Sequence, residues 1–143
     1  MAQDCIFCQI IRKESAANFV YEDDRVVAFL TNRPVNEGHT LVVPKKHYET
    51  IYELPEEEIA YLYKVVKRVA VAIRDAMVAD GVRVVQNNGS AAGQVIFHFH
   101  VHVIPMKPHE GFVHGKAYRD QSQGRLPDAL EKDAEQIRLR MPV

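Results

Sequence analysis

At 143 residues the chain is long enough for one domain with a hydrophobic core but too short for two ordinary domains. Hydrophobic residues make up 47% of it and charged residues 26%, which excludes disordered and fibrous proteins. Its 18 basic residues nearly balance its 19 acidic residues, so the net charge of -1 indicates no general attraction to nucleic acid or to an anionic membrane.

The first residues, MAQDCIFCQI, contain neither the basic start nor the apolar run of a signal peptide, and no later run is as long as a membrane span. The only two cysteines, Cys5 and Cys8, form one C-x-x-C pair, so a disulfide framework cannot be what stabilises the fold. We therefore expect a cytoplasmic protein with reduced thiols and without a nucleic acid or membrane partner.

Residues 18–47 predict three strands in sequence, which are NFVYE (18–22), RVVAFLT (25–31) and HTLVVP (39–44). Each is short, rich in β-branched or aromatic residues and bounded by turn formers. The turns between them, at Asp23-Asp24 and at PVNEG (34–38), are short. The three strands are therefore expected to form a meander.

From Pro55 to Ala79 the apolar residues recur every three or four positions, which predicts an amphipathic helix. Pro55 and the three acids after it suit a helix start, and Gly81 suits its end. The apolar stripe consists of Ile59, Leu62, Val66, Val69, Ile73 and Met77. Off this stripe lie Lys64, Lys67 and Arg68, which we interpret as a solvated face.

VRVVQ (82–86) and VIFHFHVHVIP (95–105) predict two further strands, joined by the loop NNGSAAGQ (87–94). This loop is longer than a hairpin needs, and such loops are often functional. Three strands, a helix and two strands predict an α+β domain with a mostly antiparallel five-stranded sheet. A last short helix is expected at about 127–140 from Leu130, Ala134 and Ile137.

Three histidines occupy alternate positions of the last predicted strand. Because strand side chains alternate between faces, His98, His100 and His102 share one face while the residues between them face the core. Neutral imidazole offers one nitrogen as acceptor, nucleophile or ligand and one as donor, so the row suits a metal or a phosphate. On a straight strand His98 and His102 are roughly 13 Å apart, so all three cannot share one ion.

The two cysteines supply half of a possible metal site. A two-residue gap lets one turn present two thiolates, and four nitrogen or sulfur ligands complete a structural zinc site. His47 and His98 are the best candidates for the remaining ligands of Cys5 and Cys8. The alternatives are a redox pair or two unrelated thiols, but a redox C-x-x-C normally opens a helix after a strand, and no strand precedes residue 5.

His100 and His102 then face the loop 87–94. Its glycines and small residues allow backbone amides to approach a phosphate, and Gln94 can donate a side-chain hydrogen bond beside them. A phosphate-binding loop next to two imidazoles predicts a reactive site. The alternative is that the loop is only a connection.

The run HFHVHVI (98–104) resembles the motif His-φ-His-φ-His-φ-φ of the histidine triad (HIT) proteins. The segments CIFCQII, VYEDDRVVAFL, PVNEGHTLVVPKKH and Gly93-Gln94 are similar to family sequences in the same order. The resemblance covers roughly residues 4–108, as a HIT domain with a HIT-like fold, and leaves 109–143 as a C-terminal extension. It implies a homodimer that acts as a hydrolase or transferase at the α-phosphate of a purine nucleotide substrate. The implied substrate is a nucleoside phosphoramidate or a dinucleoside polyphosphate.

The resemblance also implies roles for single residues. His100 matches the nucleophile that forms a nucleotidyl-histidine intermediate, which water then cleaves. His102 and Gln94 match contacts to the phosphate oxygens, and His39 matches a histidine near the active site. The implied nucleotide-binding residues are Phe29, Thr31, Asn32, Asn87, Gly93, Gln94, His100 and His102, with Phe29 where the family packs the purine. The implied zinc ligands are Cys5, Cys8, His47 and His98.

The chain departs from the family pattern at two positions. Thr31 stands where many members have an acid that holds the ribose hydroxyls, and Val95 stands where a serine often contacts the leaving group. The absence of tryptophan leaves the C-terminus of the phosphoramidase branch unmatched. Two other readings stay open: a catalytic zinc on His100 and His102 with an activated water, and a nucleotide-binding or interaction protein without turnover.

Overall fold

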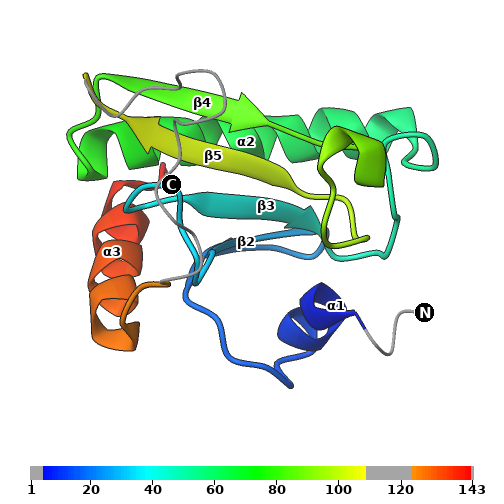
Figure 1. Cartoon of the computed structure of the whole chain (residues 1–143), viewed down its shortest axis with the longest axis horizontal. Helices are drawn as coiled ribbons and strands as arrows, with labels where there is room; N and C mark the ends of the chain where they lie inside the picture. The colour runs from blue at the N-terminus through cyan, green and yellow to red at the C-terminus, as the bar shows by residue number, and fades with distance from the viewer. Residues whose placement is uncertain (1–4, 109–123, 143) are drawn as a thin grey trace.

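The computed structural model describes residues 5–108 and 124–142, which form one antiparallel sheet flanked by helices (Figure 1). The strands are β1 (Phe19–Glu22), β2 (Val26–Leu30), β3 (Thr40–Pro44), β4 (Gly81–Val85) and β5 (Val101–Met106). The helices are α1 (Ile6–Ile11), α2 (Glu56–Ala76) and α3 (Pro127–Arg140), with a single 3-10 turn, η2, at Ser90–Ala92. The sheet order is β1-β2-β3-β5-β4 and each neighbouring pair is antiparallel. The predicted α+β class, five-stranded sheet, long helix and C-terminal helix are confirmed.

The two faces of the sheet bury different side chains. On one face α2 and α3 pack on alternate residues of the central strands, among them Ala28, Val42 and Val101. On the other face α1 covers the intervening residues, where Phe7 and Ile10 pack on Val27, Phe29, Leu41 and Val43. This division follows from the two-residue period of a strand. It leaves the second face to carry the functional site described below.

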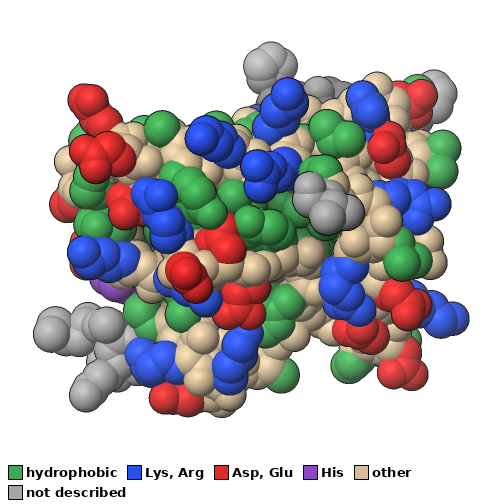
Figure 2. Space-filling model, turned by 180° about the vertical axis from the view of Figure 1, so that it is seen from behind, with side chains coloured by type: hydrophobic (Ala, Val, Ile, Leu, Met, Phe, Trp, Pro, Cys, Tyr) green, Lys and Arg blue, Asp and Glu red, His purple; other side chains and the backbone are tan. Residues whose placement is uncertain are grey.

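α2 is the predicted amphipathic helix, but it ends earlier than the sequence indicates. Val78 takes a left-handed conformation with a φ of 51° just after the helix, and Gly81 instead begins β4. Its buried stripe consists of Leu62, Val65, Val66, Val69, Ala72 and Ile73. Lys64, Lys67 and Arg68 are exposed as predicted, and Figure 2, viewed from the α2 side, shows basic and acidic side chains mixed over that face.

α3 joins the core that α2 forms with the sheet. Its buried residues include Leu130, Ala134 and Ile137, as the sequence predicts. Residues 109–123 of the predicted extension lie outside the described residues. Within the ranges that the structure describes, no helix is both long and apolar enough to cross a membrane.

The last predicted strand is shorter than expected, because β5 begins only at Val101 and residues 95–100 are not part of a strand. The prediction of a strand over 95–105 is therefore wrong in its first half. The His98 carbonyl accepts a hydrogen bond from the His100 ring at 2.7 Å, and the Phe99 N–H donates to the Tyr48 carbonyl at 2.6 Å. Backbone groups committed in this way are not available to a strand ladder.

α1 was not predicted. Cys5 is its N-cap residue, and the Cys5 sulfur accepts a hydrogen bond from the Cys8 N–H at 3.4 Å. The helix has only six residues, IFCQII, and it is stabilised by burying Phe7 and Ile10 against the sheet. Helices this short depend on tertiary packing rather than on local propensity, so sequence periodicity does not detect them.

Gly38, in the loop between β2 and β3, offers a test of backbone strain beside His39. Its φ is +92°, and an added Cβ would lie 2.7 Å from Cγ of Met77. We expect Gly38→Ala to lower the free energy of unfolding by about 1–3 kcal/mol, measured by urea denaturation, because L side chains rarely adopt this φ. Gly81→Ala is the matched control, since nothing lies within 4 Å of its added Cβ. Equal stability losses in both variants would contradict this explanation.

Candidate active site

Four side chains from three separate segments meet beside α1. Cys5 and Cys8 come from the start of this helix, His47 follows β3, and His98 precedes β5. Their ligand atoms all lie within 4.8 Å of one another. The structure thus gathers all four predicted metal ligands, and in the described part of the chain no other group of histidine, cysteine or acidic side chains is gathered in this way.

The spacing and chemistry of this cluster fit a tetrahedral metal ion. The sulfurs of Cys5 and Cys8 lie 3.4 and 3.5 Å from Nδ1 of His98, and the Nδ1 atoms of His47 and His98 are 3.1 Å apart. Zinc bonds of about 2.3 Å to sulfur and about 2.0 Å to nitrogen give tetrahedral edges of roughly 3.3 Å between nitrogens, 3.5 Å between nitrogen and sulfur and 3.8 Å between sulfurs. Nε2 of His98 donates to the Pro44 carbonyl at 2.8 Å, which leaves the lone pair on Nδ1.

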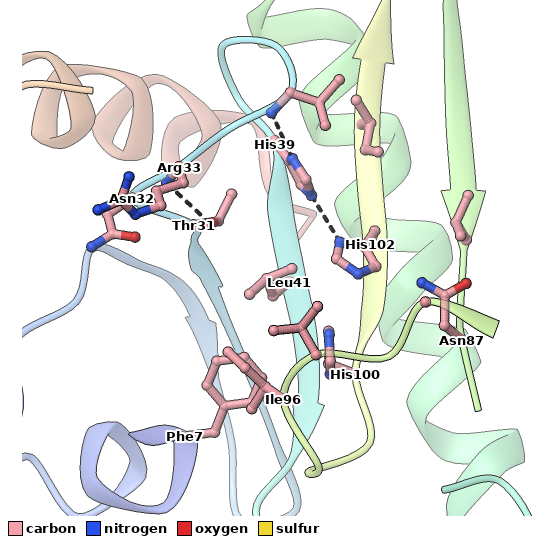
Figure 3. A pocket seen from close by; sticks show the side chains of 15 residues that line it. Phe7, Thr31, Asn32, Arg33, His39, Leu41, Asn87, Ile96, His100 and His102 are labelled. Carbon is pink, nitrogen blue, oxygen red and sulfur yellow. Dashed lines mark hydrogen bonds between the residues drawn. The ribbon is translucent and has the colours of Figure 1, made fainter. Parts of the chain in front are cut away.

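A cavity of about 530 Å³ opens on the same face of the sheet (Figure 3). Its lining includes most residues that the sequence predicts for catalysis or nucleotide binding: Thr31, Asn32, His39, Asn87, Gly93, His100 and His102. These residues come from the loop after β2, the segment before β3, the long loop before β5, and β5 itself. Residues far apart in the chain therefore converge on one site.

Strand register explains this convergence. Phe29 pairs with Leu41 across β2 and β3, and Leu41 pairs with His102 across β3 and β5, so the three side chains form one row on one face. Beyond the end of that pairing, the Thr31 N–H donates to the His39 carbonyl at 3.2 Å. Because neighbouring strands are about 4.8 Å apart, the Thr31 edge of the cavity lies roughly 10 Å from β5.

His100 presents a lone pair to this cavity. Its Nδ1 lies 2.7 Å from the His98 carbonyl, and because a carbonyl oxygen can only accept, Nδ1 carries the hydrogen. Nε2 is therefore unprotonated, and it can act as a nucleophile or an acceptor. The His100 side chain is held in place by Phe7, whose ring packs edge-on against it with a centroid distance of 5.1 Å.

A hydrogen-bond chain assigns the complementary role to His102. The Val35 N–H donates to Nδ1 of His39 at 3.0 Å, so the hydrogen of that ring is on Nε2. Nε2 of His39 lies 2.9 Å from Nδ1 of His102 and donates to it, which places the hydrogen of His102 on its own Nε2 (Figure 3). The cavity thus combines an acceptor nitrogen of His100 with a donor nitrogen of His102.

Burial keeps these imidazoles neutral. Together with the neighbouring histidines it lowers the pKa of His39 to about 3 and that of His102 to about 4. Burial also lowers the pKa of His100, although its hydrogen bond to the His98 carbonyl opposes the shift. Near pH 7 the three rings are uncharged, and the lone pair of His100 is available for chemistry.

The side chain of Gln94, a predicted phosphate contact, hydrogen-bonds to three nearby backbone groups. Its side-chain Nε2 donates to the carbonyls of Glu49 and Ile96, at 2.7 and 3.1 Å. Its Oε1 accepts from the Gly89 N–H at 2.7 Å. Because both amide hydrogens are committed to backbone carbonyls, the side chain braces the loop in this structure instead of donating into the cavity.

Phe29 lies next to the cavity rather than in it. It lines an adjoining hollow of about 210 Å³, which shares Phe7, Thr31, Asn32, Leu41 and Ile96 with the main cavity. Phe7 packs edge-on against Phe29 at a centroid distance of 5.4 Å. These aromatic and aliphatic side chains form the apolar part of the site.

Several residues that line the cavity were not predicted from the sequence, among them Phe7, Arg33, Val35 and Ile96. A signal for Phe7 was present, because it stands between two cysteines that were expected to share a ligand set with His98. That ligand set places Phe7 beside His98 and His100, with which its ring makes edge contacts. For Val35 and Ile96 we find no comparable signal in the sequence.

Comparisons with known proteins agree with this architecture. The model of the HIT domain family matches residues 12–109. The chain is 38% identical to the protein hit of Bacillus subtilis over 140 residues, which cover 98% of this chain and 96% of that protein. It is 39% identical to the adenylylsulfatase HINT3 of Arabidopsis thaliana over 137 residues, covering 96% of this chain and 67% of that enzyme.

Solved structures extend the similarity to nearly the whole chain. A hypothetical histidine triad nucleotide-binding protein from Sulfolobus tokodaii has a TM-score of 0.86 at 43% identity, covering 96% of this chain and 91% of its own. A zinc-bound histidine triad family protein from Mycobacterium smegmatis has a TM-score of 0.82 at 33% identity, covering 99% of this chain and 95% of its own. The five-stranded sheet and its helices are thus shared with both.

Proposed function

This chain belongs to the HIT family, and from that premise we propose that it is a nucleotide hydrolase or transferase acting at the α-phosphate of a purine nucleotide. The observation that carries the proposal is the pair of opposite tautomers in one cavity, with a lone pair on His100 and a hydrogen on His102. Phosphoryl transfer uses both, because a nucleophile attacks phosphorus while donors stabilise charge on its oxygens.

The reaction we propose has two displacements at one phosphorus atom. In the first, Nε2 of His100 forms a bond to the α-phosphorus, and the leaving group departs with the electrons of its own bond to phosphorus. The imidazolium formed keeps its Nδ1–H on the His98 carbonyl, which stabilises the new positive charge. In the second, water attacks phosphorus and loses a proton to solvent, the electrons of the breaking phosphorus–nitrogen bond return to Nε2 of His100, and a nucleoside monophosphate leaves. His102 donates to a phosphoryl oxygen in both steps.

The apolar part of the site is the proposed seat of the purine. Phe29, Phe7 and Ile96 lie together beside the cavity, and aromatic rings suit stacking or edge contacts with a base. The ribose would then lie toward Thr31 and Asn32, and Asn87 and Gly93 would border the phosphate. Thr31 carries no charge, so the ribose hydroxyls meet a hydroxyl side chain there in place of a carboxylate.

We propose zinc as the metal of the Cys5, Cys8, His47 and His98 cluster. Its donor set and spacing support this, and the similar Mycobacterium smegmatis protein is zinc-bound. Bound zinc would act structurally, by cross-linking α1 to the segments on either side of the site. It would also fix His98, whose carbonyl holds the ring hydrogen of His100. The cluster thereby supports the nucleophile without contacting the reacting phosphate.

We further propose that the protein is a cytoplasmic homodimer that pairs through β4. This strand lies at the edge of the sheet and its Val84 is 43% exposed, and edge strands present unpaired backbone groups to a second chain. Light scattering combined with size-exclusion chromatography should give twice the mass of one chain. A monomeric mass would contradict this proposal and leave the catalytic one intact.

A trapped intermediate tests the catalytic proposal. The protein is mixed with adenosine 5′-phosphoramidate, a diadenosine polyphosphate or adenylyl sulfate, quenched within one turnover and digested for mass spectrometry. We expect release of AMP and a nucleotidyl adduct on His100. Binding without AMP release would instead indicate a protein without turnover. Activity that is lost on chelation while the fold persists, with no adduct, would indicate water activated by a metal.

The buried histidines predict an unusual pH profile. For an imidazole with an ordinary pKa near 6.5, the fraction of molecules that are neutral and keep the lone pair would fall tenfold per pH unit below that value. Because burial lowers the pKa of His39 to about 3 and that of His102 to about 4, and also lowers the pKa of His100, we expect the acid-side decline of kcat/KM to begin below pH 6.5. Protonation of the unfolded chain below pH 6.5 lowers stability over the same range, so circular dichroism must accompany each rate. A decline that begins near pH 6.5 in folded protein would contradict the prediction.

A further inference from the structure

Arg125, two residues before the start of α3, reaches the loop that borders the catalytic cavity. Its Nε and Nη2 donate to the two carboxylate oxygens of Asp133, at 2.7 and 3.2 Å. Its backbone N–H donates to the Asn32 carbonyl at 3.1 Å, and its Nη1 lies 3.3 Å from a carboxylate oxygen of Glu37. Arg125 therefore contacts both the helix and two points of the loop between β2 and β3.

That loop, residues 31–39, carries several parts of the proposed site. Thr31 and Asn32 line the cavity, and the Val35 N–H is the donor that sets the tautomer of His39 and, through it, of His102. Figure 1 shows α3 beside the end of the sheet where β2 leads into β3. On its other side the loop is held by Asn36, whose side chain donates to the Pro105 carbonyl at 2.9 Å.

The anchor on α3 is well fixed. Asp133 is 8% exposed, and its neighbours Leu130, Ala134 and Ile137 are buried in the main core. A paired, largely buried carboxylate with two parallel bonds to a guanidinium holds that group in a defined orientation. The Glu37 contact is weaker, because that carboxylate is 66% exposed and solvent screens it.

We propose that Arg125 is a positioning residue for the nucleotide site: fixed by Asp133 of α3, it holds the loop 31–39 in the conformation that presents Thr31 and Asn32 to the nucleotide and Val35 to His39. This proposal rests on the proposed function for the kinetic readouts, KM and kcat, whereas the NMR shifts of the histidines test it independently. It gives the C-terminal helix a role in binding as well as in stability.

The experiment compares Arg125→Gln with Arg138→Gln. Arg138 is the matched control because it lies on α3, the helix that anchors Arg125, and pairs with Glu131 and the Phe19 carbonyl, both at 2.7 Å, away from the loop. The readouts are Kd for AMP by calorimetry, KM and kcat for adenosine 5′-phosphoramidate, ring-nitrogen NMR shifts of His39 and His102, and the melting temperature. Arg125→Lys is included because lysine keeps the charge without the two parallel bonds.

We expect Arg125→Gln to raise Kd and KM by about two- to thirty-fold, the range of such indirect couplings, with a smaller change in kcat. The His39 and His102 nitrogen shifts should move with it, since the Val35 N–H is displaced. Arg125→Lys should give smaller changes in the same direction, and Arg138→Gln should leave these readouts at wild-type values.

A lower melting temperature with unchanged Kd, KM and histidine shifts would overturn the proposal, because Arg125 would then only stabilise α3. Equal changes in Arg125→Gln and Arg138→Gln would overturn it as well. If Arg125→Gln does not fold, Arg125→Lys provides the same comparison. If the wild-type protein shows no turnover, the proposed function fails, yet the AMP affinity and the NMR shifts still decide the role of Arg125.

Discussion

Replacing His100 by glutamine is expected to lower kcat by about 10⁴-fold or more while Kd for AMP stays within a few-fold of the wild-type value. The reason is that, among the described residues lining the cavity, no other imidazole has a free lone pair: Nδ1 of His102 is occupied by His39, and Nδ1 of His39 by the Val35 N–H. Glutamine preserves a polar side chain of similar length without the attacking nitrogen. Single-turnover release of AMP from adenosine 5′-phosphoramidate measures the loss, and calorimetry measures binding.

His102→Gln is the control for this variant. His102 is assigned only a donor role, and removal of one transition-state donor typically costs about 10²- to 10³-fold in kcat. Its nucleotidyl adduct on His100 should still form, only more slowly, whereas His100→Gln should form none. A His100→Gln protein that turns over within tenfold of the wild type would end the proposed mechanism.

Cys8→Ser is expected to have the largest effect on stability. Loss of one of four ligands should reduce zinc content well below one ion per chain and lower the melting temperature by about 10 °C or more. The physical reason is that the cluster ties α1 to His47 and His98, while the helix itself has only six residues. Elemental mass spectrometry measures the zinc content, and differential scanning calorimetry measures the melting temperature.

The zinc prediction has its own control and its own contrary result. His102→Gln also removes a histidine of the HFHVHVI run but leaves all four proposed ligands in place, so it should keep one zinc per chain. Below its lowered melting temperature, Cys8→Ser should retain turnover at a reduced rate, because none of the four ligands lines the cavity but the His98 carbonyl holds the His100 ring. Wild-type zinc content and melting temperature in Cys8→Ser would show that the cluster is not the metal site.

Much of the fold could be predicted because its signals are local. The meander of β1, β2 and β3 follows from short runs of β-branched or aromatic residues bounded by turn formers, and α2 from its three- and four-residue spacing. The range of α3 agrees with the 127–140 expected from three apolar positions. The misassigned part, residues 95–100, is where the side chain of His100 and the carbonyl of Tyr48 compete for backbone groups. The spacing of apolar residues along the chain does not reveal competing hydrogen bonds of this kind.

The candidate site, like the fold, could be predicted from the sequence only in part. By itself the sequence determined which residue types belong together, since C-x-x-C and the alternating histidines carry their chemistry in their spacing. Only the tertiary structure decided which nitrogen of each histidine holds the hydrogen, and that the Gln94 amide braces its own loop. It also brought Phe7 and Arg125 to the site. Each of these features depends on a partner from a distant segment or on a backbone carbonyl whose position follows from packing, and neither is encoded in local sequence.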